Sequence, residues 1–239
     1  MKFTRLIAVL ATSAALVIGS TATATAADPG GAPYKTGVRT AVEEASRQKQ
    51  ETKPVVATYE GKKIDLAKGW GGAEVCTEVA VDDVRCYDTV AESNKALAKI
   101  DAGHAALAKN SAAADSRAAA PETLGARAAA SAVSTRAASD CPSGYVCVWE
   151  HYDYNTKRAG RLLKWSANGH KELSDWGFRD QVSSACITRP QGGADLNDHR
   201  TGMPDPYLIL ASKSCYNNFS KYEYTYGGNW NDRVDSIDM

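Results

Sequence analysis

The sequence predicts an all-β Greek-key sandwich for residues 140–239, preceded by a small α+β module (28–110) and an Ala-rich linker (111–139). Residues 140–239 hold 14 of the 19 aromatic residues of the 239-residue chain. Strand-like runs recur there between turn residues, without a convincing helix, and one seven-residue pattern occurs twice. Short strands at this spacing are typical of β-sandwiches with Greek-key connections.

The repeated pattern lies in Phe178–Ser184 and Trp230–Ser236. Each segment has an aromatic residue, a polar residue, Asp, any residue, Val, a short oxygen-bearing side chain and Ser. An internal repeat of this kind indicates a duplicated supersecondary unit. Chance similarity between two short segments is the alternative.

Residues 1–26 have the features of a secretory signal peptide. Lys2 and Arg5 form a basic start, Leu6–Gly19 is apolar, and Ala24-Thr25-Ala26 is a small-residue cleavage signal. A retained membrane anchor is the alternative. Because no second apolar run is long enough to span a bilayer, we expect a secreted, extracellular protein with no membrane partner after cleavage.

Charge and cysteine content narrow the classes of function. Without Lys2 and Arg5, 26 of the 28 basic residues remain against 28 acidic ones, which gives no electrostatic footprint for nucleic acid. No C-x-x-C pair supports a zinc site. In an oxidising compartment an even number of cysteines favours disulfides. The cysteines are Cys76, Cys86, Cys141, Cys147, Cys186 and Cys215.

The module at 28–110 is expected to combine a helix over 37–50, two hairpins and a second helix. The hairpins pair 55–59 with 63–66 and 73–79 with 84–87, and Thr89–Glu92 has the form of a capping box before the second helix. Cys76 and Cys86 lie on facing arms, which predicts a cross-strand disulfide. Trp70 is expected in the core of the module, with a binding role as the alternative.

Residues 111–139 predict a linker. Thirteen of these 29 residues are Ala and none is aromatic, so the segment buries too little apolar surface to offset its ordering entropy. Its arginines at 117, 127 and 136 are either sites of proteolytic nicking or solubilising charge. We expect 140–239 to fold on its own.

Six strands are expected in 140–239, together with an exposed connection at Pro190–Pro206. Four cysteines allow three connectivities. The turn residues Pro142-Ser143-Gly144 favour Cys141–Cys147, which leaves Cys186–Cys215. The expected strands are 145–150, 161–165, 181–187, 207–211, 221–226 and 233–237.

The stretch Cys141–Glu150, then Gly160-Arg161, Leu173–Phe178 and Asp180–Ser184, resembles the start of the peptidase inhibitor family I36 domain. Residues Tyr59–Cys86 resemble, less specifically, leader modules of such secreted actinobacterial proteins. The resemblance implies a βγ-crystallin-like fold of two Greek-key units. It also implies a peptidase as partner, since the characterised inhibitors of the family bind microbial peptidases, including metallopeptidases.

Such folds often bind calcium through two Asp/Asn residues, two free positions, Ser/Thr and Ser. Two residues depart from this pattern: Arg179 places a positive charge beside the first segment, and Asp235 takes the Ser/Thr position of the second, where it still offers oxygen. Turn-forming roles for the same residues are the alternative. Oxygen ligands suited to calcium would come from Asp180, Ser183, Asn231, Asp232 and Asp235.

The chain lacks H-E-x-x-H, G-x-S-x-G and phosphate-binding glycine loops, so we do not expect an enzyme or a required cofactor. Trp149, Trp165, Trp176 and Trp230 are expected in the core, with a sugar-binding platform as the alternative. We therefore expect a monomeric inhibitor that occupies an extracellular peptidase's active site non-covalently. Gly192–Met203 is its most exposed candidate loop, although neither the inhibitory loop nor the target follows from the sequence. A calcium-stabilised cell-wall or carbohydrate-binding module is the alternative.

Overall fold

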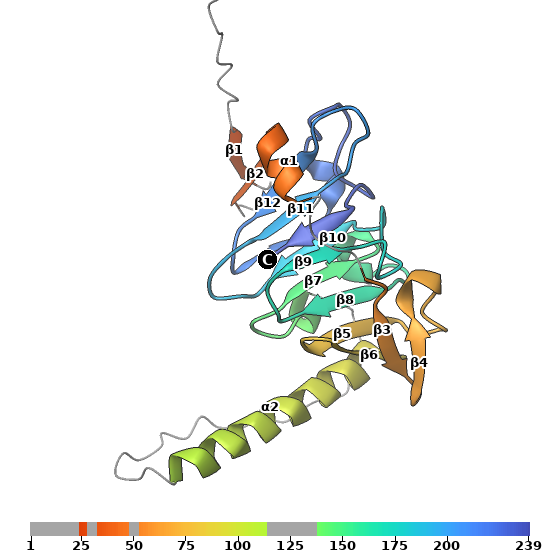
Figure 1. The fold of residues 1–239 in the computed structure, drawn as a ribbon, viewed down its shortest axis with the longest axis vertical. Coiled ribbons are helices and arrows are strands. Elements are labelled where there is room, and N and C mark those ends of the chain that lie inside the picture. The colour runs from red at the N-terminus through yellow and green to blue at the C-terminus, as the bar shows by residue number, and fades with distance from the viewer. Residues whose placement is uncertain (1–23, 28–32, 48–52, 114–137) are drawn as a thin grey trace, which may run out of the picture.

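The computed structural model describes residues 24–27, 33–47, 53–113 and 138–239, and it is mostly β with two sheets (Figure 1). One sheet has six strands, in the order β1 (Ala24–Ala27), β2 (Pro33–Val38), β12 (Pro206–Leu210), β11 (Ala194–Asn197), β14 (Ser236–Asp238) and β9 (His170–Glu172). The other has eight, in the order β13 (Ser214–Tyr216), β10 (Ser184–Ile187), β7 (Val146–Trp149), β8 (Leu162–Trp165), β5 (Val75–Ala80), β6 (Asp83–Tyr87), β3 (Val56–Tyr59) and β4 (Lys62–Asp65).

The last hundred residues consist of two four-strand units that exchange one strand. In the unit β7–β10, three strands lie in the eight-stranded sheet, but β9 pairs with β14 in the other sheet. In the unit β11–β14, three strands lie in the six-stranded sheet, but β13 pairs with β10. This matching connectivity gives the repeated sequence segments a structural counterpart, since each segment leads into the fourth strand of its unit.

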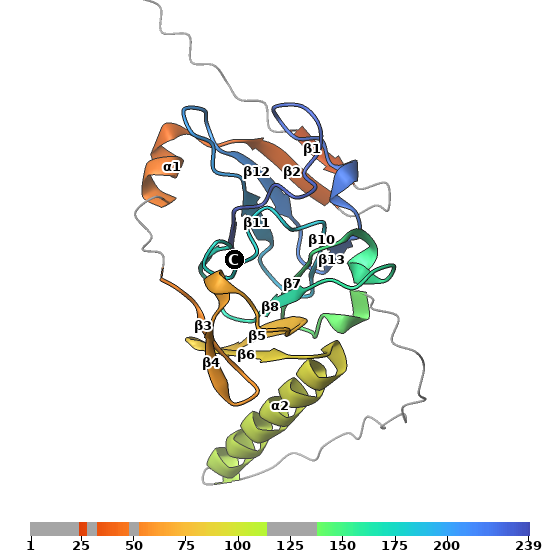
Figure 2. The same ribbon diagram turned by 90° about the vertical axis from the view of Figure 1, so that its right-hand side faces the viewer.

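The N-terminal strands complete both sheets and do not form a separate layer. Strand β2 pairs antiparallel with β12, and β5 pairs parallel with β8 from Val75 opposite Leu162 to Glu78 opposite Trp165. Figures 1 and 2 show β3–β6 continuing the sheet that holds β7 and β8. This continuity differs from the two separate domains expected from the sequence.

The main core lies between the sheets and includes side chains from both halves of the chain. Trp70 belongs to it, as expected, and its Nε1 donates to the Trp176 carbonyl at 2.7 Å. The Trp70 ring stacks on Phe178 with 5.7 Å between centroids, and the Arg161 guanidinium lies 4.9 Å from the Trp70 centroid. The N-terminal module is thus packed against the first four-strand unit.

A second core covers the outer face of the eight-stranded sheet. Helix α2 (Val90–Ala113) lies beside β5 and β6 (Figure 2). Its Val90 and Leu97 belong to this core, with Trp149 and Leu162 of the sheet. The helix begins as its capping box predicts, since Glu92 N donates to Thr89 Oγ1 at 3.2 Å. With a core on each face of the sheet, every residue of β7, β8 and β10 is buried, including Lys164 and Ser184.

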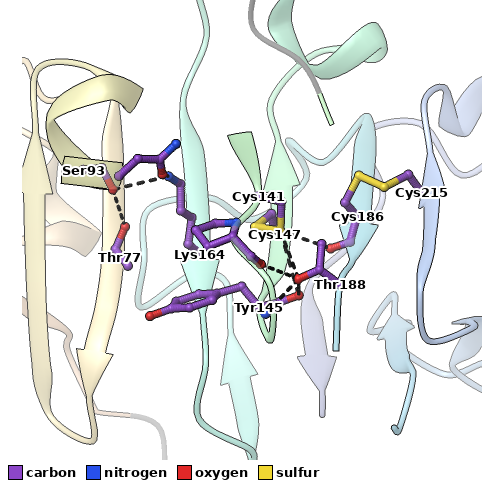
Figure 3. Close-up of a disulfide and its surroundings, with 11 residues drawn as sticks. Thr77, Ser93, Cys141, Tyr145, Cys147, Lys164, Cys186, Thr188 and Cys215 are labelled. Atoms are coloured by element: carbon purple, nitrogen blue, oxygen red, sulfur yellow. Dashed lines mark hydrogen bonds between the residues drawn. A yellow bond between two sulfur atoms is a disulfide. The ribbon is translucent and has the colours of Figure 1, made fainter. Parts of the chain in front are cut away.

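Three disulfides join Cys76 to Cys86, Cys141 to Cys147 and Cys186 to Cys215, the same pairs that the sequence favours. Figure 3 shows the last two pairs. Cys76 and Cys86 are directly opposite in β5 and β6, and Cys186 and Cys215 are opposite in β10 and β13. Each bond therefore fixes a local strand pair or turn.

Several expected elements differ from the structure. The stretch Pro190–Pro206 is not one exposed loop, because it contains β11, whose Ala194 and Leu196 are buried. The expected strand 221–226 forms no ladder: Phe219–Lys221 is a 3₁₀ helix, and a single bridge joins Glu223 to Asn229. Buried and exposed side chains still alternate along this segment, because Tyr222 and Tyr224 are buried.

The expected helix at 37–50 is shorter than predicted. Residues 33–38 pair with β12 as β2, and helix α1 (Ala41–Arg47) begins after Thr40. Thr40 and Glu43 form a capping box, in which Thr40 N donates to Glu43 Oε2 at 2.7 Å and Glu43 N to Thr40 Oγ1 at 3.3 Å. Short 3₁₀ helices also occur at Leu66–Lys68, Ala138–Asp140 and Tyr152–Asn155.

Two expectations fall mainly on residues outside the described ranges. The signal peptide at 1–26 is described only from Ala24, where β1 pairs with β2. The linker is described only at its ends, in α2 and in the 3₁₀ helix Ala138–Asp140. Among the described residues, no helix is long and apolar enough to cross a membrane.

Lys164 is fully buried beneath α2, on the face of β8 that the helix covers (Figure 3). Its Nζ donates to Asn94 Oδ1 at 2.6 Å and to Ser93 Oγ at 3.3 Å. Ser93 Oγ also lies 3.0 Å from Thr77 Oγ1. Burial lowers the pKa of Lys164 from 10.5 to about 8, against a smaller opposing effect of Asp140.

We expect Lys164→Met to stabilise the protein at neutral pH. The unfolded chain binds the Lys164 proton more tightly than the folded chain does, so burying the charged lysine lowers the stability of the fold. This loss of stability is fully present below pH 8 and disappears as the pH rises towards 10.5. Chemical denaturation at pH 7 should show a gain of about 1–3 kcal/mol in the free energy of unfolding, and a smaller gain at alkaline pH. Lys63→Met, at an exposed position on β4, is the control. A loss of stability at pH 7 would contradict this account.

We expect 140–239 to fold alone but to melt below a fragment that retains 33–239. Removing the N-terminal strands uncovers the edges of β8 and β12 and the surface of Phe178 that Trp70 covers. Circular dichroism should show a melting temperature lower by about 10 °C or more. Equal melting temperatures would mean that the shared sheets contribute nothing to stability.

Candidate functional site

A polar cleft of about 410 Å³ lies where the two repeated segments meet the β11–β12 loop, residues 198–205. Acidic, basic and amide side chains line it, with almost no apolar surface. Its lining residues are Arg179, Asp180, Asp198, His199, Arg200, Asn231, Asp232, Arg233 and Asp235.

The two repeated segments form a reciprocal pair. Asp180 and Asp232 both have left-handed backbones, with φ of 56° and 55°. Asp180 N donates to the Val234 carbonyl and Asp232 N to the Val182 carbonyl, each at 3.1 Å. Asp tolerates this conformation better than most residues, so both aspartates have a turn-forming role whatever else they do.

Part of the calcium pattern comes together in the structure. Ser183 Oγ lies 2.8 Å from Asp232 Oδ1 and 2.9 Å from the Glu150 carbonyl oxygen. Asn231 Nδ2 donates to Asp232 Oδ2 at 2.7 Å. Both Asp232 oxygens thus accept bonds from neighbouring side chains, while the Asp180 carboxylate lies 3.7 Å from Arg179 Nε.

Asp235, the fifth candidate ligand, is paired with an arginine. Arg179 Nε lies 2.6 Å from Asp235 Oδ1, and Nη2 donates to Oδ2 at 2.8 Å. The His199 amide also donates to Asp235 Oδ2, at 2.7 Å. Burial raises the pKa of Asp235 to about 7, against the opposing effects of the His199 amide and Arg179. A guanidinium at this carboxylate disfavours a cation there.

These residues do not fit a complete calcium site. Calcium takes six to eight oxygen ligands. Here the Asp235 carboxylate is already ion-paired with Arg179, and two further arginines add positive charge to the lining of the cleft. Within the described residues, no three or more His, Cys, Asp or Glu side chains are grouped to hold a metal ion.

A chain of carboxylates and histidines lies beside the cleft and connects β9 and β14 with the β11–β12 loop. His170 Nδ1 is 2.7 Å from Asp238 Oδ1, and its Nε2 is 3.8 Å from Glu172 Oε2. His199 Nε2 is 3.3 Å from the same Glu172 oxygen, and its Nδ1 is 3.0 Å from Asp205 Oδ2. No sequence motif marks this arrangement, because its members lie far apart in the chain.

The pKa shifts follow from these contacts. Burial alone would raise the pKa of Glu172, but hydrogen bonds from His170 and His199 outweigh it and hold the pKa below its ordinary value. The hydrogen bond with Glu172 raises the pKa of His199, with a further contribution from Asp205. The raised pKa favours the charged form of His199, whose contact with Glu172 ties the loop to β9.

The exposed candidate stretch Gly192–Met203 divides into distinct parts. Gly193 packs so closely on the Leu210 carbonyl that a Cβ would clash, and β11 is largely buried. Exposure is continuous only from Arg200 to Pro204. The exposed part of this stretch is thus the tip of the β11–β12 loop.

All four tryptophans of the C-terminal hundred residues are buried, at 0–3% exposure. Trp165 and Trp176 pack edge to face with centroids 5.3 Å apart. Trp149 and Trp230 are equally enclosed, in the outer and main cores respectively. Buried rings cannot stack on a sugar, so these residues form no carbohydrate platform.

We expect millimolar calcium to change the melting temperature of the protein by less than about 1 °C relative to chelator. Asp232→Ala should lower it by several degrees equally in both conditions, because Ser183 and Asn231 lose a shared acceptor. Asp180→Ala, at a half-exposed carboxylate, is the matched control. Calcium-dependent stabilisation that Asp232→Ala abolishes would show that the cleft holds calcium after all.

No curated protein and no solved structure matches this chain. A family model does match residues 134–187, which span β7 to β10 and thus the first four-strand unit. The matched segment therefore contains the first of the two repeated segments but neither the β11–β12 loop nor the N-terminal strands. Residues 134–187 are similar to the peptidase inhibitor family I36.

Proposed function

We propose that the chain is a secreted peptidase inhibitor that occupies an extracellular peptidase's active site non-covalently. The observation that carries this proposal is the match of residues 134–187 to the peptidase inhibitor family I36. The second unit repeats the strand connectivity of the first, which supports a βγ-crystallin-like Greek-key pair extending to the C-terminus. Three disulfides are in keeping with an oxidising, extracellular setting.

The structure supplies what such an inhibitor needs. Disulfides and shared sheets hold the surface loops in place, and a loop fixed before binding loses less entropy in the complex. His170 and His199 contact carboxylates, and His151 Nε2 lies 3.1 Å from the Ala159 carbonyl oxygen. The match to an inhibitor family favours binding without turnover.

The alternative is an extracellular module that calcium stabilises and that binds cell wall or carbohydrate. The buried tryptophans disfavour carbohydrate binding, and the Arg179–Asp235 ion pair disfavours calcium binding. The inhibitor is accordingly proposed as a monomer without a required cofactor.

We expect the secreted chain to inhibit at least one microbial peptidase reversibly, with an inhibition constant in the nanomolar to micromolar range, about −12 to −8 kcal/mol. A panel of metallo-, serine, cysteine and aspartic peptidases would be titrated, with mass spectrometry to check that the inhibitor stays intact. The same protein with its disulfides reduced and alkylated is the control and should lose activity. Absence of inhibition across the panel, or rapid degradation of the chain, would refute the proposal.

A further inference from the structure

The β11–β12 loop is exposed at its tip and closed at its base. Asp198 and Asp205, at its two ends, are buried. Asp198 N donates to the Pro206 carbonyl at 3.2 Å. Inside the loop, Asp205 Oδ1 accepts from Arg200 N at 2.6 Å and Oδ2 lies 3.0 Å from His199 Nδ1. The Asp205 side chain therefore holds both strands of the loop together.

Other parts of the chain brace the same loop from outside. Arg39 N donates to the Asp205 carbonyl at 2.8 Å, and Glu44 Oε1 accepts from Asp205 N at 2.5 Å. On the other side, Tyr226 Oη donates to the Pro204 carbonyl at 2.7 Å. Contacts from the β2–α1 segment and from the segment before β14 thus fix the loop before any partner binds.

The tip presents one apolar side chain in a defined backbone. Gly202, with φ of 75°, forms the turn, and Met203 follows it with 42% of its surface exposed. Pro204 disfavours a helical backbone at Met203, and the chain bends at Met203. The Met203 side chain therefore lies at the turn of an exposed loop.

We infer that Met203-Pro204 is the segment that enters the peptidase's active-site cleft, with the Met203 side chain in an apolar specificity pocket. This inference rests on the proposed function and adds the contact surface and the class of target, a peptidase that prefers apolar side chains. Pro204 has no backbone N–H and its ring fixes φ, so the Met203–Pro204 bond is a poor one to cleave. The segment therefore binds as a substrate does but resists hydrolysis.

The corresponding loop of the first unit, residues 150–161, has a different backbone conformation. It also exposes an aromatic side chain, Tyr152, at 45%. However, Asp153, Tyr154 and Asn155 are all left-handed, with φ of 52°, 58° and 60°. Three successive left-handed residues give this loop a different backbone from the Met203 tip, so Tyr152 serves as the control position.

The test compares inhibition constants of the full secreted chain, Met203→Ala, Pro204→Ala and Tyr152→Ala against peptidases that prefer apolar side chains. Met203→Ala should weaken inhibition about 10- to 100-fold, the effect of losing one buried apolar side chain. Tyr152→Ala should inhibit like the unmodified chain. Pro204→Ala should be cut slowly after Met203, which peptide mapping detects. Melting temperatures check that each variant is folded.

The outcomes separate the two proposals. If the unmodified chain inhibits and Met203→Ala inhibits equally well, Met203 is not the contact residue, although the inhibitor function stands. The same holds if only Tyr152→Ala loses inhibition. If the unmodified chain inhibits no peptidase, the proposed function fails and this inference fails with it.

Discussion

The need to cover both faces of β7, β8 and β10 determines most of this structure. All residues of these strands are buried. The six-stranded sheet covers one face, and α2 covers the other together with Tyr154 and the segment around Cys141. Strand β5 pairs with the edge of β8. This pairing satisfies backbone N–H and C=O groups that an unpaired edge would leave exposed. The N-terminal module is therefore a part of the sandwich, held by backbone hydrogen bonds as well as by side chains.

Elements with strong local signals could be predicted from the sequence. The hairpins around Glu60-Gly61 and Asp82-Asp83, the capped helix α2 and most C-terminal strands lie where the pattern places them. The strands β2, β9, β11 and β13 have three to six residues each and are defined by their partners. For β11, the surrounding glycines and prolines conceal the inward-facing Ala194 and Leu196. Tyr222 and Tyr224 show the reverse case, an alternation that reflects burial without a hydrogen-bonded ladder.

The candidate site could be located from the repeated segments but not interpreted from them. Arg179 and Asp235 each depart from the calcium pattern, and they are 56 residues apart in the chain. The structure shows that the two departures compensate each other, since the arginine neutralises the additional carboxylate. The pairing of β9 with β14 and the backbone hydrogen bonds between the two segments bring these positions together. The same holds for Glu172 and His199, which no motif connects.

The disulfides have a consequence for a chain that is cut in two. Cys76–Cys86 lies before Ala113, and the other two bonds lie after Ala138, so no covalent bond other than the backbone joins the halves. After a single cut between these residues, the β5–β8 and β2–β12 ladders and the shared core would still hold the pieces together. The nicked protein would behave as a heterodimer that denaturant alone separates. The two halves are in this sense complementary fragments, each supplying edge strands to the other.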